Sequence, residues 1–419
     1  MGDYRKLWSS LNMDLEKHDK LCAVLPQYYG ETHMSQLNRP EGMNYFNFVV
    51  AEVHGLRIEE LDNHRKSGGK VLGTFCVFVP DEVILAAGAI GVGLCGGSQF
   101  WIEDGETVMP RNICPLIKAF VGAKVGGTCP YVQSCDMLVG ETTCDGKKKA
   151  WEILDEYVPV HVMDLPQMKR TKDYAMWEDE IKIFMAEVEK LTGNKITVEG
   201  LKKGIELCNR KRRALKRLYD FRKYQPSPIS GLDALLISQI AFYDDPERFT
   251  QNLEELCDEL EERVKDLKPT GKKRIMITGT PMAIPNWKLH SIIESLDAEV
   301  VVEETCTGTR YFENEVSAEG NTIEELIKNL ADRYLQINCA CFTPNGGRID
   351  DIIKYADEYK VDGVINCNLA FCNNYAVEYR SVEKALREKE IPVILIETDY
   401  SAEDSGQIKT RVEAFLEMI

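Results

Sequence analysis

An alternation of short apolar strands and amphipathic helices occurs twice in this chain, on either side of a long stretch without strands. Over residues 71–167 the expected strands are KVLGTFCVFVP, IGVGLCGG, DMLVGETT and VPVHVMDLP, with helices over DEVILAAGA and DGKKKAWEIL. Over residues 271–419 they are RIMITG, AEVVVEE, YLQINCACF, DGVINCNLAF and IPVILIETDY. This pattern predicts an α/β protein with two flavodoxin-like, doubly wound parallel sheets.

The remaining segments have helical spacing. Residues 1–70 are expected to form a helical N-terminal region, and residues 168–270 a helical connector between the two α/β domains. A length of 419 residues agrees with more than one domain. The basic run from Arg210 to Lys223 is interpreted as a solvated helix face, with a docking surface as the alternative.

Cysteine usage indicates metal rather than disulfides. The chain has 14 cysteines, and its charged N-terminus lacks the apolar core of a secretory signal, so reduced thiols in a cytoplasmic protein are expected. No run is long and apolar enough for a membrane span, and a net charge of −17 disfavours a nucleic-acid partner. Neither CxxC nor CxxCxxC occurs, so any ligands must come from distant loops.

The cysteines gather at one edge of the predicted sheets, where ligands bind in open parallel sheets. At or just beyond expected strand ends lie Cys95, Cys144, Cys306, Cys341 and Cys372, and the loop region between two strands holds Cys114 and Cys129. Cys339 and Cys341 would share one strand face, so either could be the ligand. By contrast, buried structural thiols are expected at Cys76, Cys208 and Cys257.

The two halves also correspond in order. Cys144 and Cys372 occupy matching places, as do Cys95 and Cys306, which favours two similar domains. Helix N-termini after Cys144 and Cys372, with the lysines at 147–149, would stabilise thiolates and a negatively charged cluster. An iron–sulfur centre is therefore favoured; zinc is the second candidate metal, but a structural zinc needs only four ligands.

Other motifs in the sequence give little information about function. GVGLCG lies inside a strand that follows a helix, which is the wrong context for dinucleotide binding, and no phosphate loop occurs. The six histidines have no ligand spacing and are expected at the surface or in caps. As catalytic acids, Glu141, Glu103 and Asp104 are candidates, although solvated turn carboxylates are the expected interpretation.

From about residue 71 to its end, the chain resembles the 2-hydroxyacyl-CoA dehydratase and benzoyl-CoA reductase subunit family. The resemblance rests on VPDEVILAAGAIGVGLCGG, NICPLIKAF, VGETTCDGKKK, EETCTGTRYF and DGVINCNLAFCNNYAVE. It implies one four-iron cubane held by three cysteines, which match Cys114, Cys144 and Cys372 here.

Additional cysteines make the chain similar to one branch of that family, the double-cubane-cluster proteins. Cys129 in GTCPY and the pair Cys339 and Cys341 in NCACF carry this likeness. It implies an [8Fe-9S] centre with six cysteine ligands, from a set that includes Cys306. It further implies a homodimer served by a separate ATP-hydrolysing iron–sulfur activator.

Three functions follow as hypotheses. The first is ATP-dependent, low-potential reduction of small molecules at a double cubane. The second is an (R)-2-hydroxyacyl-CoA dehydratase subunit with a single [4Fe-4S] cluster. The third, a zinc or thiol storage protein, requires the rim cysteines to be incidental.

Overall fold

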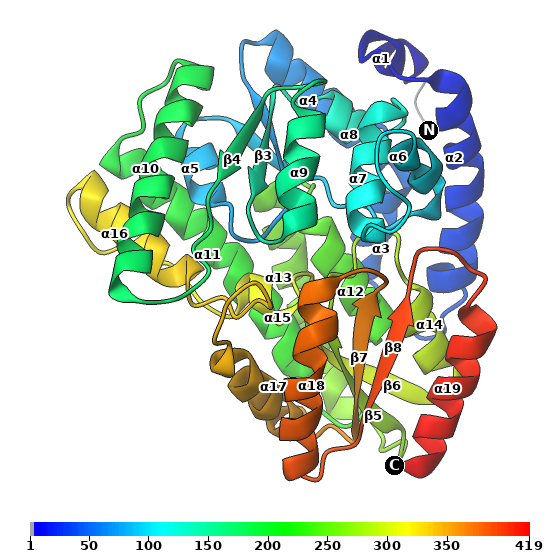
Figure 1. The fold of residues 1–419 in the computed structure, drawn as a ribbon. Helices are drawn as coiled ribbons and strands as arrows, with labels where there is room; N and C mark the ends of the chain where they lie inside the picture. Colours follow the sequence, from blue (N-terminus) through cyan, green and yellow to red (C-terminus); the bar gives the residue numbers. More distant parts are fainter. Residues whose placement is uncertain (1–3) are drawn as a thin grey trace.

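The computed structural model describes residues 4–419. It opens with a helical region whose first two helices lie at the right of Figure 1. The elements of this region are α1 (Arg5–Ser10), α2 (Leu15–Tyr29), the π-helix η1 (Gly30–Met34), α3 (Met43–Ala51) and α4 (Leu56–Lys66). The Asp14 carboxylate caps α2 by accepting a hydrogen bond from the Lys17 amide.

The first sheet has four parallel strands in the order β2-β1-β3-β4. They are β1 (Val71–Thr74), β2 (Ile90–Gly93), β3 (Met137–Glu141) and β4 (Val160–Met163). Between them lie α5 (Asp81–Ala86), the 3-10 helix η2 (Gln99–Trp101), α6 (Ile102–Glu106), α7 (Pro115–Val125), α8 (Pro130–Gln133) and α9 (Asp145–Leu154).

A helical segment then leads to the second sheet. It comprises α10 (Thr171–Thr192), α11 (Val198–Phe221), α12 (Gly231–Ile240), α13 (Pro246–Arg263) and the 3-10 helix η3 (Val264–Asp266). The basic run on α11 is only partly solvated, since Lys211 and Arg212 are buried. Its more exposed members pair with carboxylates, as Arg217 does with Asp258 and Glu261. The expectation of a solvated face was therefore wrong for part of the run.

The second sheet repeats the first, with four parallel strands in the order β6-β5-β7-β8. Its strands are β5 (Lys273–Gly279), β6 (Ala298–Glu304), β7 (Gly363–Leu369) and β8 (Val393–Thr398). Its helices are α14 (Lys288–Ser295), α15 (Thr309–Phe312), α16 (Ile323–Tyr334), α17 (Gly346–Glu358), α18 (Asn373–Glu388) and α19 (Ser405–Met418). The expected α/β class with two flavodoxin-like units is confirmed, while the exact domain boundaries stay a prediction.

Two expected strands differ in the structure. YLQINCACF is not a strand: a Thr322–Glu325 capping box starts α16, whose buried face extends to Tyr334, and irregular turns follow. Cys339 and Cys341 therefore share no strand face. KVLGTFCVFVP is a strand only as far as Thr74, so Cys76 lies in the loop beyond β1.

The arrangement of the two sheets positions the site. Figure 1 shows the first sheet above and the second below, with α12 and α3 near the level where they meet. In both sheets the residues that follow the strands line one common cavity. Within residues 4–419, no helix combines the length and the hydropathy needed to cross a membrane.

Candidate metal centre between the two sheets

A cavity of about 320 Å³ lies between the carboxyl ends of the two sheets. Its walls come from loops after β1, β2 and β3 on one side and after β5, β6 and β7 on the other. Half of the chain's 14 cysteines line it: Cys76, Cys95, Cys114, Cys144, Cys306, Cys339 and Cys372. This concentration of thiols at one place is the chemical signature of the site.

Three of these thiols stand at the starts of helices. Cys114, Cys144 and Cys372 are the N-cap residues of α7, α9 and α18. Amide groups in the first turn of a helix have no partner within the helix, and the helix dipole is positive at that end. Each of the three positions therefore favours an anion placed before it, although burial raises the pKa of the Cys144 thiol itself.

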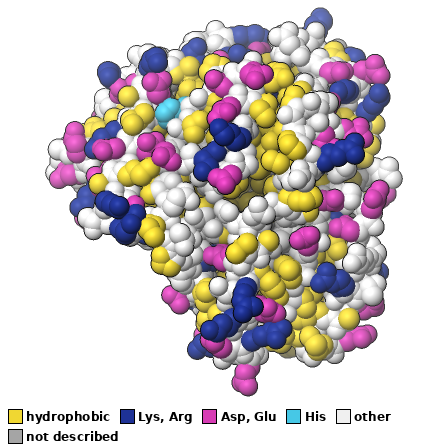
Figure 2. Space-filling view, viewed as in Figure 1, with side chains coloured by type: hydrophobic (Ala, Val, Ile, Leu, Met, Phe, Trp, Pro, Cys, Tyr) yellow, Lys and Arg dark blue, Asp and Glu magenta, His cyan; other side chains and the backbone are white. Residues whose placement is uncertain are grey.

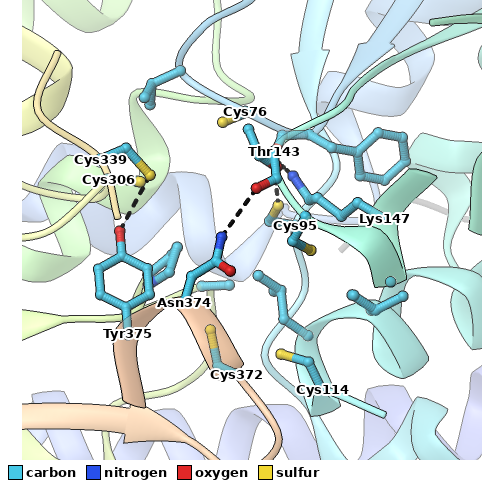
Figure 3. A pocket seen from close by; sticks show the side chains of 18 of the residues that line it. Cys76, Cys95, Cys114, Thr143, Lys147, Cys306, Cys339, Cys372, Asn374 and Tyr375 are labelled. Carbon is cyan, nitrogen blue, oxygen red and sulfur yellow. Dashed lines mark hydrogen bonds between the residues drawn. The ribbon is translucent and has the colours of Figure 1, made fainter. Parts of the chain in front are cut away.

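Thiol–thiol contacts divide the cavity cysteines into groups. Cys114 and Cys372 act on each other, which lowers the pKa of Cys114 and raises that of Cys372. On the other side, Cys339 and Cys341 act on each other, which lowers the pKa of Cys339 and raises that of Cys341. Figure 3 shows Cys114 and Cys372 together at one side and Cys306 with Cys339 at another, with Cys95 apart from both pairs beside Lys147. The Cys95 thiol donates to the Phe75 carbonyl at 3.1 Å.

A buried lysine faces the thiols from the first half. Lys147 on α9 forms an ion pair with Glu141 at the end of β3 and donates to the Phe75 carbonyl at 3.3 Å. Burial opposes the charge, but Glu141, Cys76 and Cys95 nevertheless hold the pKa of Lys147 well above its ordinary value. The ammonium is therefore a fixed positive charge beside the thiol group.

The second half supplies an arginine in the corresponding role. Arg310 on α15 pairs with Glu304 at the end of β6, with 2.5 Å between Nε and Oε1. Arg310 also donates to the Tyr375 hydroxyl and lies 3.8 Å from the Cys306 sulfur. The Tyr375 oxygen is 3.5 Å from the Cys339 sulfur. The Arg310 guanidinium therefore places positive charge beside Cys306, and the Tyr375 hydroxyl is within hydrogen-bonding distance of Cys339.

Other residues complete the cavity. Asn374 donates to the Thr143 carbonyl at 3.1 Å, which joins the second half to the first across the site (Figure 3). Phe371 precedes Cys372, is 56% exposed and adopts a left-handed φ of 62°. A bulky residue rarely takes this conformation. Hydrophobic side chains gather near the middle of the face in Figure 2, beside α7 and α9, among interspersed acidic and basic groups.

The structure brings together most of the cysteines expected from the sequence. Cys114, Cys144, Cys306, Cys339 and Cys372 line the cavity, as does Cys95, and Cys341 adjoins it through Cys339. Cys129 does not line it; as the N-cap of α8, it packs against a small separate cluster that includes Leu21 and Trp101. Cys208 and Cys257 are buried within helices, as expected.

One cavity thiol was assigned wrongly. Cys76 lines the cavity, although an apolar run had suggested a structural thiol inside a strand. The sequence gives no signal for this strand end, because the apolar run TFCVFVP continues past Thr74.

The predictions for the acidic residues and the histidines also need correction. Glu141 is fully buried and bonded to Lys147, so it is not a solvated turn carboxylate. Glu103 is exposed and Asp104 pairs with Lys17 at 2.7 Å; neither lines the cavity. His18, His33 and His290 are fully buried rather than at the surface.

The spacing of the thiols discriminates between metals. Two thiolates on one zinc ion lie at most about 4.6 Å apart, because each Zn–S bond is about 2.3 Å. Among the described residues, no three of the cavity thiols come within 4.8 Å of one another. Thiols spread over the walls of a roomy cavity, with two buried cations nearby, fit a multinuclear iron–sulfur centre better than a single zinc.

The chain is similar in sequence to several known proteins. The sequence profile of the family described as 2-hydroxyglutaryl-CoA dehydratase, D-component, matches residues 76–419. YjiM of Escherichia coli K12, provisionally named a dehydratase subunit, is 39% identical over 85% of this chain and 93% of its own. The beta subunit of (R)-phenyllactyl-CoA dehydratase from Clostridium sporogenes is 26% identical over 90% of this chain and 98% of its own. One of the benzoyl-CoA reductase subunits from Thauera aromatica is 24% identical over 81% of this chain and 87% of its own.

Proposed function

Because this chain belongs to the 2-hydroxyglutaryl-CoA dehydratase D-component family, we propose that it is an iron–sulfur enzyme that reduces small molecules at low potential. The centre proposed for the cavity is a double cubane, [8Fe-9S], held by six cysteine thiolates. When bound, such a centre supplies single electrons at low potential. The reaction depends on ATP hydrolysed by a separate activator protein.

The number of thiols in the cavity carries this proposal. A single cubane with three protein ligands is satisfied by Cys114, Cys144 and Cys372, which all stand at helix N-termini. That set leaves Cys306 and Cys339 without a role, although both face the same cavity and contact Arg310 or Tyr375. We assign these two to the second half of the centre.

The sixth ligand comes from Cys76 or Cys341. Cys341 contacts Cys339, and both Cys76 and Cys306 act electrostatically on it. Cys129, a ligand candidate from the sequence, lies outside the cavity and is left out of the proposed set.

The chain's own residues would prepare the cavity for an anionic centre. Lys147 and Arg310 offset negative charge from opposite sides, and each is held by a strand-end glutamate. The Tyr375 hydroxyl supports Cys339 by hydrogen bonding. Hydrogen bonds and charges around sulfur ligands are known to set the potential of such centres.

The remaining lining suits a small and largely neutral substrate. Ile113, Phe242, Ile284 and Phe371 make apolar walls, while Asn112 offers an amide for orientation. Both buried cations of the thiol region are already paired with glutamates, so a strongly anionic substrate has no free partner there.

Electron delivery is proposed to come from outside the chain. No phosphate loop is present in the sequence, so an ATP-hydrolysing iron–sulfur activator would dock and transfer electrons to the centre. A homodimer is the proposed assembly.

The alternative function is that of an (R)-2-hydroxyacyl-CoA dehydratase subunit with one [4Fe-4S] cluster. It is favoured by the completeness of the trio at the helix N-termini and by the similarity to the phenyllactyl-CoA dehydratase beta subunit.

Iron and acid-labile sulfide analysis of anaerobically purified protein separates the two functions. About eight irons per chain support the reductase, and about four support the dehydratase. Iron-free, colourless protein from an anaerobic, iron-supplemented culture would contradict both functions.

A further inference from the structure

A second group of metal-ligating side chains lies in the N-terminal helical region, away from the cavity. His18 and Cys22 are four residues apart on α2, so they share one face of that helix. His54 reaches them from the turn between α3 and α4. Within residues 4–419, this is the one set of three histidine, cysteine or carboxylate side chains whose ligand atoms all lie within 4.8 Å of one another.

Two of the three distances among these atoms are close to the edges of a metal tetrahedron. His18 Nε2 is 2.9 Å from His54 Nδ1 and 3.5 Å from Cys22 Sγ. Zinc bonds of about 2.0 Å to nitrogen and 2.3 Å to sulfur give tetrahedral edges of about 3.3 Å between nitrogens and about 3.5 Å between nitrogen and sulfur. Along these two edges, a metal ion needs movements of only a few tenths of an ångström, and the third distance, between His54 and Cys22, is within 4.8 Å.

The surroundings hold the three ligands in place. His18 has no exposed surface, and the Trp8 ring packs edge-on against it with the ring centroids 4.3 Å apart. Trp8 also donates from its indole nitrogen to the His54 carbonyl at 2.7 Å, which fixes the turn. Ligands with restricted rotamers bind a metal at a lower entropic cost.

We propose that His18, Cys22 and His54 bind one zinc ion, with a water molecule as the fourth ligand. Two imidazoles and one thiolate are the donor types that zinc prefers, and three protein ligands leave one position open. On binding, Cys22 releases its proton, and each imidazole keeps its N–H on the nitrogen that does not face the metal. The ion would cross-link α2 to the turn before α4 and so stabilise the N-terminal region.

The test measures zinc and iron in the same sample, because empty cluster thiols would also bind zinc. Anaerobically purified, cluster-containing protein is dialysed against zinc chloride, then against buffer, and both metals are counted. We expect about one zinc per chain in the wild type and less than about a tenth in Cys22→Ser and in His54→Gln, with iron unchanged. Cys257→Ser, which alters a buried thiol on α13 outside both sites, is the matched control and should keep its zinc.

A cobalt titration supplies a second measurement. Cobalt bound to a thiolate gives an intense near-ultraviolet band, and we expect Cys22→Ser to lose that band while His54→Gln weakens it. Unchanged iron content shows that each variant is folded. Full zinc content in Cys22→Ser and His54→Gln, or no zinc in cluster-loaded wild type, would overturn the proposal. Neither result would affect the cavity assignment, which rests on iron.

Discussion

At the scale of single residues, the site depends on where a side chain stands along its element. Cys144 and Cys372 are chemically ordinary thiols, but each is the first residue before a helix of at least ten residues. The sequence reveals such positions well, because DGKKKAWEIL is recognisably helical and DMLVGETT recognisably a strand. It reveals Cys76 poorly, since the apolar run TFCVFVP hides the place where β1 stops.

Replacing Cys144 by alanine should remove iron rather than simply weaken folding. An incidental, half-buried turn thiol would cost only about half a kcal/mol when truncated. Loss of one thiolate leaves half of the centre with fewer protein ligands, so iron content and visible absorbance should fall markedly. Both are measured on anaerobically purified protein. Cys208→Ala, on α11, is the control and should keep both; a Cys144→Ala protein with full iron and unaltered spectrum would remove Cys144 from the ligand set.

The charge of Lys147 should raise the reduction potential of the centre. Its removal would leave Glu141 buried and unpaired, so the informative variant is Lys147→Met combined with Glu141→Gln. The reference is the single variant Glu141→Gln, which differs from the double variant only by the charge of Lys147. Without that cation, adding an electron to an anionic centre becomes harder, and the midpoint potential of the double variant in a spectroscopic redox titration should be more negative than that of Glu141→Gln. Lys149→Met removes an exposed lysine of the same helix and should leave the wild-type potential unchanged. Equal potentials in Glu141→Gln and the double variant would show that the cation has no such role.

At the scale of elements, helix and strand types were mostly predictable, and their ends were not. YLQINCACF reads as a strand by composition, yet Leu330, Ala331 and Tyr334 continue the buried face of α16 into its first residue. Tertiary packing thereby overrides local β propensity. The consequence reaches the site, because Cys339 and Cys341 adjoin each other across a turn instead of alternating along a strand.

The attachment of α11 to the second sheet depends on Glu303, which is buried at the end of β6. Arg222 donates to both of its oxygens at 2.7 and 2.8 Å, and Tyr219 donates at 2.6 Å. Glu303→Gln should therefore lower the free energy of unfolding by about 3 to 5 kcal/mol in urea denaturation, since it leaves Arg222 without its charge partner. Glu261→Gln, which alters an exposed partner of Arg217, should cost less than about 1 kcal/mol.

The same carboxylate predicts a dependence on pH. Burial favours the neutral acid, but Arg222 and the hydrogen bonds nevertheless lower the pKa of Glu303 to about 2, from an ordinary 4.5. A depressed folded-state pKa gives stability above pH 4.5 that is lost as the pH falls toward 2. The gap in unfolding free energy between wild type and Glu303→Gln should therefore shrink over that range. A gap that stays constant down to pH 2 would argue that Glu303 is not ionised in the folded protein.

At the scale of the whole molecule, the cavity exists because two sheets with the same strand order face each other with their carboxyl ends. The matching order of β1–β4 and β5–β8 puts Cys144 and Cys372 after equivalent strands, and likewise Cys95 and Cys306. The sequence predicted this correspondence and the family. The sequence could not predict that the two halves face each other. That arrangement depends on contacts such as the hydrogen bond from Asn374 to Thr143, which are more than 200 residues apart in the chain.

This facing arrangement also bears on how electrons reach the centre. The cavity is lined by loops of this one chain, and no phosphate-binding loop occurs in the sequence, so on the proposed function we expect the energy of ATP to act through a docked activator. We expect the isolated chain to show no tight binding of Mg-ATP by calorimetry, and substrate reduction to require both activator and ATP. A strong low-potential chemical reductant should replace both, because ATP serves only to drive the electron to the centre. A Cys144→Ala protein is the control and should remain inactive whether electrons come from the activator with ATP or from the chemical reductant. Tight nucleotide binding by the chain alone, or a chemically reduced, iron-replete protein that still needs ATP, would place the ATP-dependent step within this chain and contradict the proposal.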